Sequence, residues 1–110
     1  MTKLDTRHFW PKVVQVLPTD NFEVYAYLND GSVRLYDVKP LLKKNSVFES
    51  LMDIQIFKKT LTVMNDTIAW DISGNRDTYK CIDIDPFTIF EQTPVTDPLA
   101  CATVAATRIV

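Results

Sequence analysis

The pattern of apolar and polar positions predicts an opening strand followed by an antiparallel hairpin. Residues 12–17 form a β-branched run that a proline and several turn-forming residues close, as is typical of a strand. Residues 22–28 and 32–38 then flank Asp30-Gly31, a pair that favours a two-residue type I′ turn, because both central residues of that turn need positive φ. We therefore expect two antiparallel strands joined at residues 30–31.

A two-residue turn also fixes which side chains share a face of this hairpin. Leu28 would face Val33, and Ala26 would face Leu35, so that these apolar residues point into the core. The opposite face would then carry the candidate binding residues Tyr25, Tyr27, Arg34 and Tyr36. Two interpretations stay open: a helix covers this face and the arginine stacks on a ring, or the face is a contact surface, since tyrosine and arginine are enriched where proteins bind proteins.

The residues on either side of Asn65-Asp66 predict a second hairpin. In the expected register, Leu61 lies opposite Trp70, and Val63 lies opposite Ile68. These four side chains then share one face. Trp70 is therefore predicted to anchor the core.

Proline and capping signals predict three short helices. Pro40 suits the first turn of the first one. Ser46 and Glu49 have the spacing of a capping box, which predicts a helix with an apolar face directly after them. Asp85-Pro86 supplies an N-cap and a preset first residue for a helix over residues 87–91.

Together these elements indicate an α+β fold, in which short helices pack on antiparallel hairpins. A further strand is expected over residues 79–84, whereas residues 54–57 are apolar without a clear period. We expect residues 11–91 to form a single small domain and residues 92–110 to form a C-terminal tail that is compatible with a short helix. Residues 97–110 of the tail either pack on a second copy of the chain, pack on the tyrosine-bearing face of their own chain, or remain a frayed terminus.

Composition removes several classes of function and favours one compartment. The 110 residues carry a net charge of -2 and contain only 2 Gly, 1 His and 2 Cys, which disfavours glycine-rich phosphate loops, multi-histidine zinc sites and four-cysteine metal clusters. Charges among the first residues argue against a secretory signal, and no apolar stretch is long enough for a membrane span. We therefore expect a cytoplasmic protein with reduced cysteines and no membrane association. Direct nucleic-acid binding is disfavoured, because the positive charges are scattered.

Three groups of residues are candidates for chemistry, and each has a stronger structural explanation. Three aspartates and a glutamate between residues 77 and 91 could bind a hard cation, but their spacing does not fit an EF-hand. His8 and Cys81 could form a thiolate pair, yet they fall in a loose N-terminus and a strand. Asp37 and Asp71 could serve a hydrolase, although carboxylates here sit mostly where turns and caps need them. We assign no catalytic residue, metal ligand or cofactor.

The order of these signals resembles a small bacterial family called Domain of Unknown Function 2442. The resemblance covers residues 11 to 91 and rests on Pro11, Val16, Asp30-Gly31, Tyr36-Asp37-Val38, Phe48, Leu51, Asp53, Phe57, Trp70 and Asp85-Pro86. It implies a small α+β domain, sometimes joined to a helix-turn-helix segment and often encoded beside another small protein in a toxin-antitoxin-like pair. It implies no catalytic residues. This chain departs from the pattern in residues 71–84 and from Thr93 onward, and it has no helix-turn-helix segment.

The main functional hypothesis is a non-catalytic protein-interaction or accessory module, which binds a protein partner or a second copy of itself as a homodimer. The binding surface would be the tyrosine-bearing face, the tail or a free strand edge. The alternative is a domain that binds a small molecule or an ion in an aromatic-lined cleft. A concave apolar cleft with converging polar groups would favour that alternative, and two close carboxylates with perturbed pKa values would favour a hydrolase.

Overall fold

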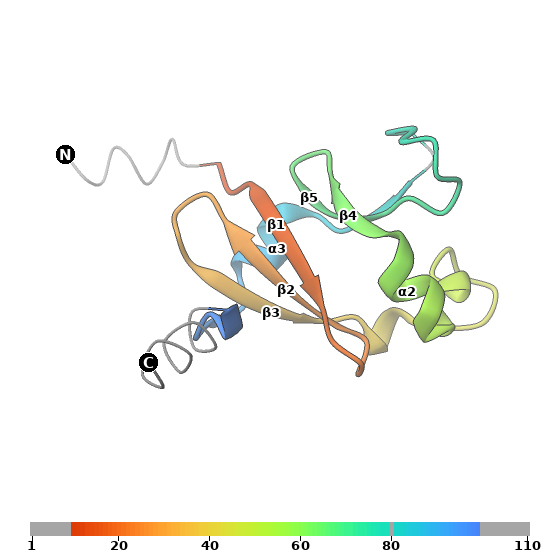
Figure 1. The fold of residues 1–110 in the computed structure, drawn as a ribbon, viewed down its shortest axis with the longest axis horizontal. Coiled ribbons are helices and arrows are strands. Elements are labelled where there is room, and N and C mark those ends of the chain that lie inside the picture. The colour runs from red at the N-terminus through yellow and green to blue at the C-terminus, as the bar shows by residue number, and fades with distance from the viewer. Residues whose placement is uncertain (1–9, 80, 100–110) are drawn as a thin grey trace, which may run out of the picture.

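Two antiparallel sheets form the framework of the protein. The structure is a computed structural model that describes residues 10–79 and 81–99 (Figure 1). One sheet, sheet A, has the strand order β1-β2-β3-β7, and the other, sheet B, has the order β4-β5-β6. The strands are β1 (Val13–Pro18), β2 (Glu23–Leu28), β3 (Val33–Asp37), β4 (Leu61–Met64), β5 (Thr67–Trp70), β6 (Ile82–Asp83) and β7 (Pro94–Val95). With the short helices described below, the predicted α+β class is confirmed.

The hairpin between β2 and β3 has a three-residue loop, so the predicted two-residue turn is wrong. The Leu28 N–H donates to the Ser32 carbonyl at 2.9 Å, and Gly31 has a φ of 88°. Asn29 and Asp30 keep negative φ, which is the arrangement of a type I turn followed by a glycine bulge. The Asp30 carboxylate stabilises this loop, because it accepts hydrogen bonds from both the backbone N–H and the hydroxyl of Ser32.

The hairpin between β4 and β5 has the predicted two-residue turn and the predicted register. Asn65 and Asp66 have φ values of 55° and 62°, as a type I′ turn requires. Leu61 pairs with Trp70, and Val63 with Ile68. This prediction is confirmed. The turn forms without a glycine because asparagine and aspartate tolerate the left-handed conformation.

The helices are short, and two of them begin at aspartate caps. They are the 3-10 helices η1 (Lys39–Leu41) and η2 (Glu49–Met52) and the α-helices α2 (Ile54–Thr60) and α3 (Pro86–Phe90). Asp85 caps α3 as predicted, since its carboxylate accepts from the Phe87 N–H at 2.9 Å. Asp53 caps α2 in the same way through the Gln55 N–H at 2.9 Å, and this helix was not predicted, because its apolar residues show no helical period.

The predicted helix after Ser46 is replaced by a turn that leads into η2. The Ser46 hydroxyl accepts from the Phe48 N–H at 3.2 Å, and the Glu49 carboxylate accepts from the Asn45 N–H at 3.1 Å. The capping interactions therefore form around a turn, and η2 begins only at Glu49. The extended conformation of Asp53 then ends η2 and starts α2.

One apolar core lies between the inner face of sheet A, sheet B and the helices. Trp70 is fully buried, which confirms its prediction as a core anchor, and its ring lies 5.5 Å from that of Phe57. The Val13 N–H donates to the Asp66 carbonyl at 2.8 Å and so joins the two sheets through their backbones. The buried cluster consists of Val13, Val24, Ala26, Leu28, Val38, Leu51, Phe57, Ile68, Trp70, Ile84 and Ile89.

The C-terminal part of the described chain returns to sheet A. β7 pairs with β3, with Val95 opposite Val33, so regular structure continues past residue 91. The strand expected over residues 79–84 is reduced to β6. The helix expected in the tail lies largely outside the described residues, which end at Leu99. Within the described chain, no helix has the length and apolar character needed to cross a membrane.

Candidate functional site

The four predicted binding residues do not share one face of sheet A. In the observed register, Ala26 pairs with Arg34 and Val24 pairs with Tyr36, so the arginine and Tyr36 lie on the inner face. Tyr25 pairs with Leu35 on the outer face, where Tyr27 also lies. The predicted common face is therefore wrong, because a loop of one extra residue shifts the register by one position and turns each β3 side chain to the other side.

Arg34 is a buried residue that holds the end of α3. Its Nη1 donates to the carbonyls of Phe90 at 2.8 Å and Gln92 at 2.6 Å, and its guanidinium carbon lies 4.7 Å from the centre of the Phe90 ring. Its Nε donates to the Ser32 hydroxyl at 3.1 Å, and Asp30 lies 3.9 Å from Nη2. The interpretation in which a helix covers this arginine and a ring stacks on it fits these contacts.

Tyr27 joins the outer face of sheet A to the chain that follows β7. Its hydroxyl donates to the Asp97 carboxylate at 2.7 Å. Burial, together with this hydrogen bond and the charge of Asp97, raises the pKa of Tyr27 to about 12. On the inner face, burial and the nearby charge of Asp37 raise the pKa of Tyr36 above its ordinary value.

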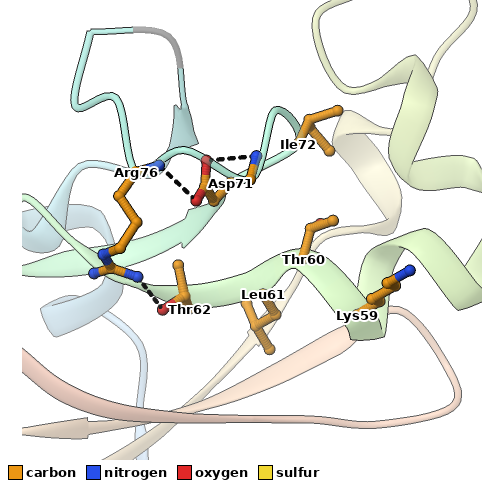
Figure 2. Close-up of a pocket in the computed structure, with 8 residues that line it drawn as sticks. Lys59, Thr60, Leu61, Thr62, Asp71, Ile72 and Arg76 are labelled. Carbon is orange, nitrogen blue, oxygen red and sulfur yellow. Dashed lines mark hydrogen bonds between the residues drawn. The ribbon is translucent and has the colours of Figure 1, made fainter.

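A polar cleft of about 500 Å³ lies between the end of α2, β4 and the loop that follows β5 (Figure 2). The Asp71 carboxylate organises the loop, since it accepts from the backbone N–H groups of Gly74 at 3.2 Å and Arg76 at 2.9 Å. Figure 2 shows the Arg76 side chain directed at Thr62, to whose hydroxyl it donates at 3.3 Å. Asp71 thus has a structural role as an organiser of this loop.

The carboxylates proposed for chemistry are dispersed over separate turns and caps. Asp37 lies at the end of β3 and forms an ion pair with Lys39 at 3.0 Å. Although burial raises the pKa of Asp37, the hydrogen bonds and charge of Lys39 outweigh that effect and hold this pKa below its ordinary value. Among residues 10–79 and 81–99, no three histidine, cysteine, aspartate or glutamate residues are grouped as metal ligands would be.

Of the predicted thiolate pair, His8 lies outside the described residues, and only Cys81 lies within them. Cys81 is half-buried just before β6. Burial and the negative charge of Asp83 raise the pKa of its thiol, as do the charges of Asp71 and Asp77. A raised pKa disfavours the thiolate that nucleophilic chemistry requires.

A second cleft, of about 560 Å³, has both apolar and polar lining residues and lies beside the outer edge of sheet B. We call it the edge cleft, and it is lined by Val47, Phe48, Tyr79, Cys81, Ile82 and Asp83. β6 forms one wall and is the last strand of its sheet. The turn before η2 supplies the other wall, and the Phe48 ring lies edge-on to Trp70 with 6.4 Å between ring centres.

Two side chains that line the edge cleft project into solvent. Val47 is 71% exposed and Tyr79 is 96% exposed, although both are large apolar or aromatic side chains. Sequence reasoning missed this cleft, because it assigned Val47 to the apolar face of a helix and Tyr79 to a strand. The signal that the sequence offers is Tyr79, an aromatic residue directly after a segment rich in turn-forming residues.

The two antiparallel sheets, with their short helices and the edge cleft, define a small α+β domain. The chain belongs to a family described as a protein of unknown function, DUF2442, whose model matches residues 13–94. This match confirms the resemblance predicted from the sequence, and it includes residues 71–84, where we expected a departure. No curated protein matches the chain. No solved structure matches it either.

Proposed function

We propose that this protein is a non-catalytic interaction module that binds another polypeptide at the edge cleft. The observation that carries the proposal is the exposure of Val47 and Tyr79, at 71% and 96%, beside one and the same cleft. Large apolar side chains that stand together on a surface favour association, because their burial against a partner removes apolar area from water. Tyrosine is also enriched among residues that dominate binding energy.

The shape of the cleft favours a polypeptide over a small molecule. Small-molecule sites enclose 70–90% or more of the surface of a drug-sized ligand, which requires walls that are themselves largely covered. Tyr79 is almost fully exposed, so a ligand inside the cleft would leave most of this ring in water. A polypeptide that crosses the cleft buries the outer sides of the walls as well.

The position of β6 supports an extended partner segment. β6 is an edge strand of sheet B, and β5 is its neighbour within the sheet. The backbone groups on the outer side of an edge strand can pair with an added strand. The side chains of such a segment would alternate between the cleft and solvent, so every second residue would contact Val47, Phe48 or Ile82.

The family resemblance supplies a candidate for the partner. Because members of this family are often encoded beside another small protein, we propose that the partner is the neighbouring gene product in a bacterial, cytoplasmic, toxin-antitoxin-like pair. Self-association through the same cleft is the competing arrangement.

The volume of the edge cleft favours a second candidate function, the binding of a small apolar molecule. A volume of about 560 Å³ falls within the range of ligand sites, which is about 300–1,000 Å³. In this case a ligand would contact mainly Phe48 and Ile82, the less exposed apolar residues of the lining. Substitution of Tyr79 would then affect binding less than substitution of Ile82.

Affinity capture of the tagged, full-length protein from its own cells tests the main proposal. We expect the neighbouring gene product to be recovered with the parent chain. Val47→Lys and Tyr79→Lys are each expected to weaken its binding by about 30-fold, the effect of removing one dominant contact residue. Binding is measured afterwards with the two purified proteins.

Ile72→Lys is the matched control, because Ile72 is also an exposed apolar residue, at 41%, but lines the polar cleft instead. This variant should bind like the parent. Equal losses in all three variants, or no loss in either edge-cleft variant, would contradict the proposal. Light scattering of the purified chain shows whether Tyr79→Lys instead converts a dimer to a monomer.

A further inference from the structure

The polar cleft beside sheet B carries more positive than negative charge, although the chain as a whole has a net charge of -2. Lys59 and Arg76 line it together with one carboxylate, that of Asp71. This carboxylate is already used within the loop, because it accepts from the backbone N–H groups of Gly74 and Arg76. Within the described part of the chain, neither Lys59 nor Arg76 forms an ion pair. An anion in the cleft can therefore pair with both cations without displacing a carboxylate.

The Arg76 guanidinium is oriented by the protein although it is exposed. Its Nη1 donates to the Thr62 hydroxyl at 3.3 Å, and its Nη2 donates to the Val63 carbonyl at 3.1 Å. The backbone of Arg76 has a φ of 55°, which is uncommon for arginine, and the Asp71 carboxylate holds this conformation through the Arg76 N–H at 2.9 Å. A guanidinium carries more N–H donors than the two contacts with β4 use, so donors remain for a ligand.

The hydroxyl beside this guanidinium supplies a further donor. The Thr62 hydroxyl accepts from Arg76, and within residues 10–79 and 81–99 its own proton has no acceptor. The hydroxyl of Thr60, by contrast, donates to the Ile56 carbonyl at 2.8 Å. Figure 2 shows Arg76 and Thr62 at one end of the cleft and Lys59 at the other. The cleft thus has a group of hydrogen-bond donors at one end and a second positive charge at the opposite end.

We propose that the polar cleft binds a small molecule that carries a phosphate monoester group. Such a group has a charge of about -1.5 to -2 at neutral pH and three acceptor oxygens, which suit the N–H groups of Arg76, the hydroxyl of Thr62 and the charge of Lys59. The cleft volume of about 500 Å³ lies within the range of small-molecule sites, about 300–1,000 Å³, so the rest of the molecule has room beside the phosphate. This inference concerns a different surface from the edge cleft and does not depend on the proposed function.

A chemical-shift titration of the isotope-labelled, full-length protein with methyl phosphate tests this site. Dimethyl phosphate, which carries a single charge, and sodium chloride at the same ionic strength are the reference titrations. We expect methyl phosphate to shift the amide signal of Thr62 and the side-chain Nε–H signal of Arg76 until they saturate, while the signals of Ile82 and Asp83 in β6 stay in place. Equal shifts with dimethyl phosphate or with chloride would overturn the proposal, because they would show a general response to charge.

Variants of the two donor residues locate the binding. Arg76→Gln should weaken methyl phosphate binding by about 10-fold or more, the effect of losing hydrogen bonds to a charged group. Thr62→Val keeps the shape of the side chain and removes its hydroxyl, so it should also weaken binding, by about 3-fold to 10-fold. Lys12→Gln is the matched control, because it removes one positive charge from an exposed residue outside the cleft, and it should bind like the parent.

The amide spectrum of each variant shows that it is folded, and the two site variants test the cleft independently. Equal losses in Arg76→Gln and Lys12→Gln, or no loss in either site variant, would overturn the proposal. A phosphoserine peptide is the last probe. If it binds more tightly than methyl phosphate, the ligand is a polypeptide, and the assignment to a small molecule is overturned.

Discussion

Trp70 lies fully buried among other aromatic rings, and its indole N–H has no hydrogen-bond partner in the described structure. A buried donor that is left unpaired costs about 1–3 kcal/mol, so this side chain contributes packing at the expense of one unsatisfied polar group. Its neighbours Phe48 and Phe57 contact the ring by an edge and a tilted face. The residue therefore offers a way to separate packing from hydrogen bonding.

Trp70→Ala is expected to lower the free energy of unfolding by about 3–5 kcal/mol, because it leaves a large cavity in the core. Trp70→Phe should cost clearly less, since it keeps an aromatic ring and removes the unpaired N–H. Urea denaturation of the two variants and the parent measures both values. Equal losses for Phe and Ala would contradict the contribution of the aromatic ring to core packing.

At the scale of elements, Arg34 links β3 to the end of α3. The helix has only five residues, so its own hydrogen bonds cannot stabilise it in isolation. Asp85 caps its beginning, and the Arg34 guanidinium binds the carbonyls of Phe90 and Gln92 at its end. Both ends of α3 are therefore fixed by charged side chains, one local in sequence and one distant.

Arg34→Met is expected to destabilise the protein by about 3 kcal/mol, because it removes the three hydrogen bonds of a buried charged group, to Phe90, Gln92 and Ser32, while it keeps much of the apolar stem. Arg76→Met is the control. It removes two arginine hydrogen bonds, to Thr62 and Val63, but from an exposed position, where a loss of about 0.5 kcal/mol or less is expected.

Chemical denaturation gives the two free energies, and amide exchange shows whether Arg34→Met selectively loses protection in residues 86–90. If Arg34→Met lowers the free energy of unfolding less than Arg76→Met does, Arg34 does not stabilise the end of α3.

For the whole molecule, the Tyr27–Asp97 hydrogen bond predicts how stability falls at alkaline pH. The pKa of Tyr27 is raised from 10.0 to about 12 in the folded protein, so folding favours the neutral phenol. This contribution is fully present below pH 10 and is lost as the pH rises through about 12, because an ionised Tyr27 has no proton to donate and is repelled by Asp97.

Tyr27→Phe is therefore expected to be less stable than the parent at neutral pH, by about 1 kcal/mol for one hydrogen bond. Between pH 10 and pH 12 the difference should close, since only the parent loses the contribution of Tyr27. Thermal melts across this range measure the difference. A difference that stays constant with pH would show that Tyr27 ionises with its ordinary pKa.

The family and most of the architecture could be predicted from the sequence, because they depend on local chemistry. Asn65-Asp66 specifies a type I′ turn, and that turn fixes the pairing of Leu61 with Trp70. Asp85-Pro86 likewise specifies the start of α3. Such signals act over a few residues, and the alternation of apolar residues around them agrees with the same fold.

Much less of the candidate site could be predicted, because it depends on register and on contacts between distant segments. Both a two-residue and a three-residue loop are compatible with the residues around Asp30-Gly31, and Ala26 faces the core with either one. The two loops differ in which β3 side chains face inward, and the three-residue loop places Arg34 where it contacts Phe90 and Gln92, which are distant in sequence. The difference moves Arg34 from a predicted binding face to a buried cap.

By itself, then, the sequence determined the α+β class, the second hairpin and the aromatic anchor of the core. The tertiary structure alone decided which side chains remain at the surface. Val47 and Tyr79 line the same edge cleft although two short helices, two strands and the loop after β5 separate them in sequence. Tyr27 meets Asp97 over a still longer separation. These contacts form because the core brings the segments together, and no pattern within a few residues specifies them.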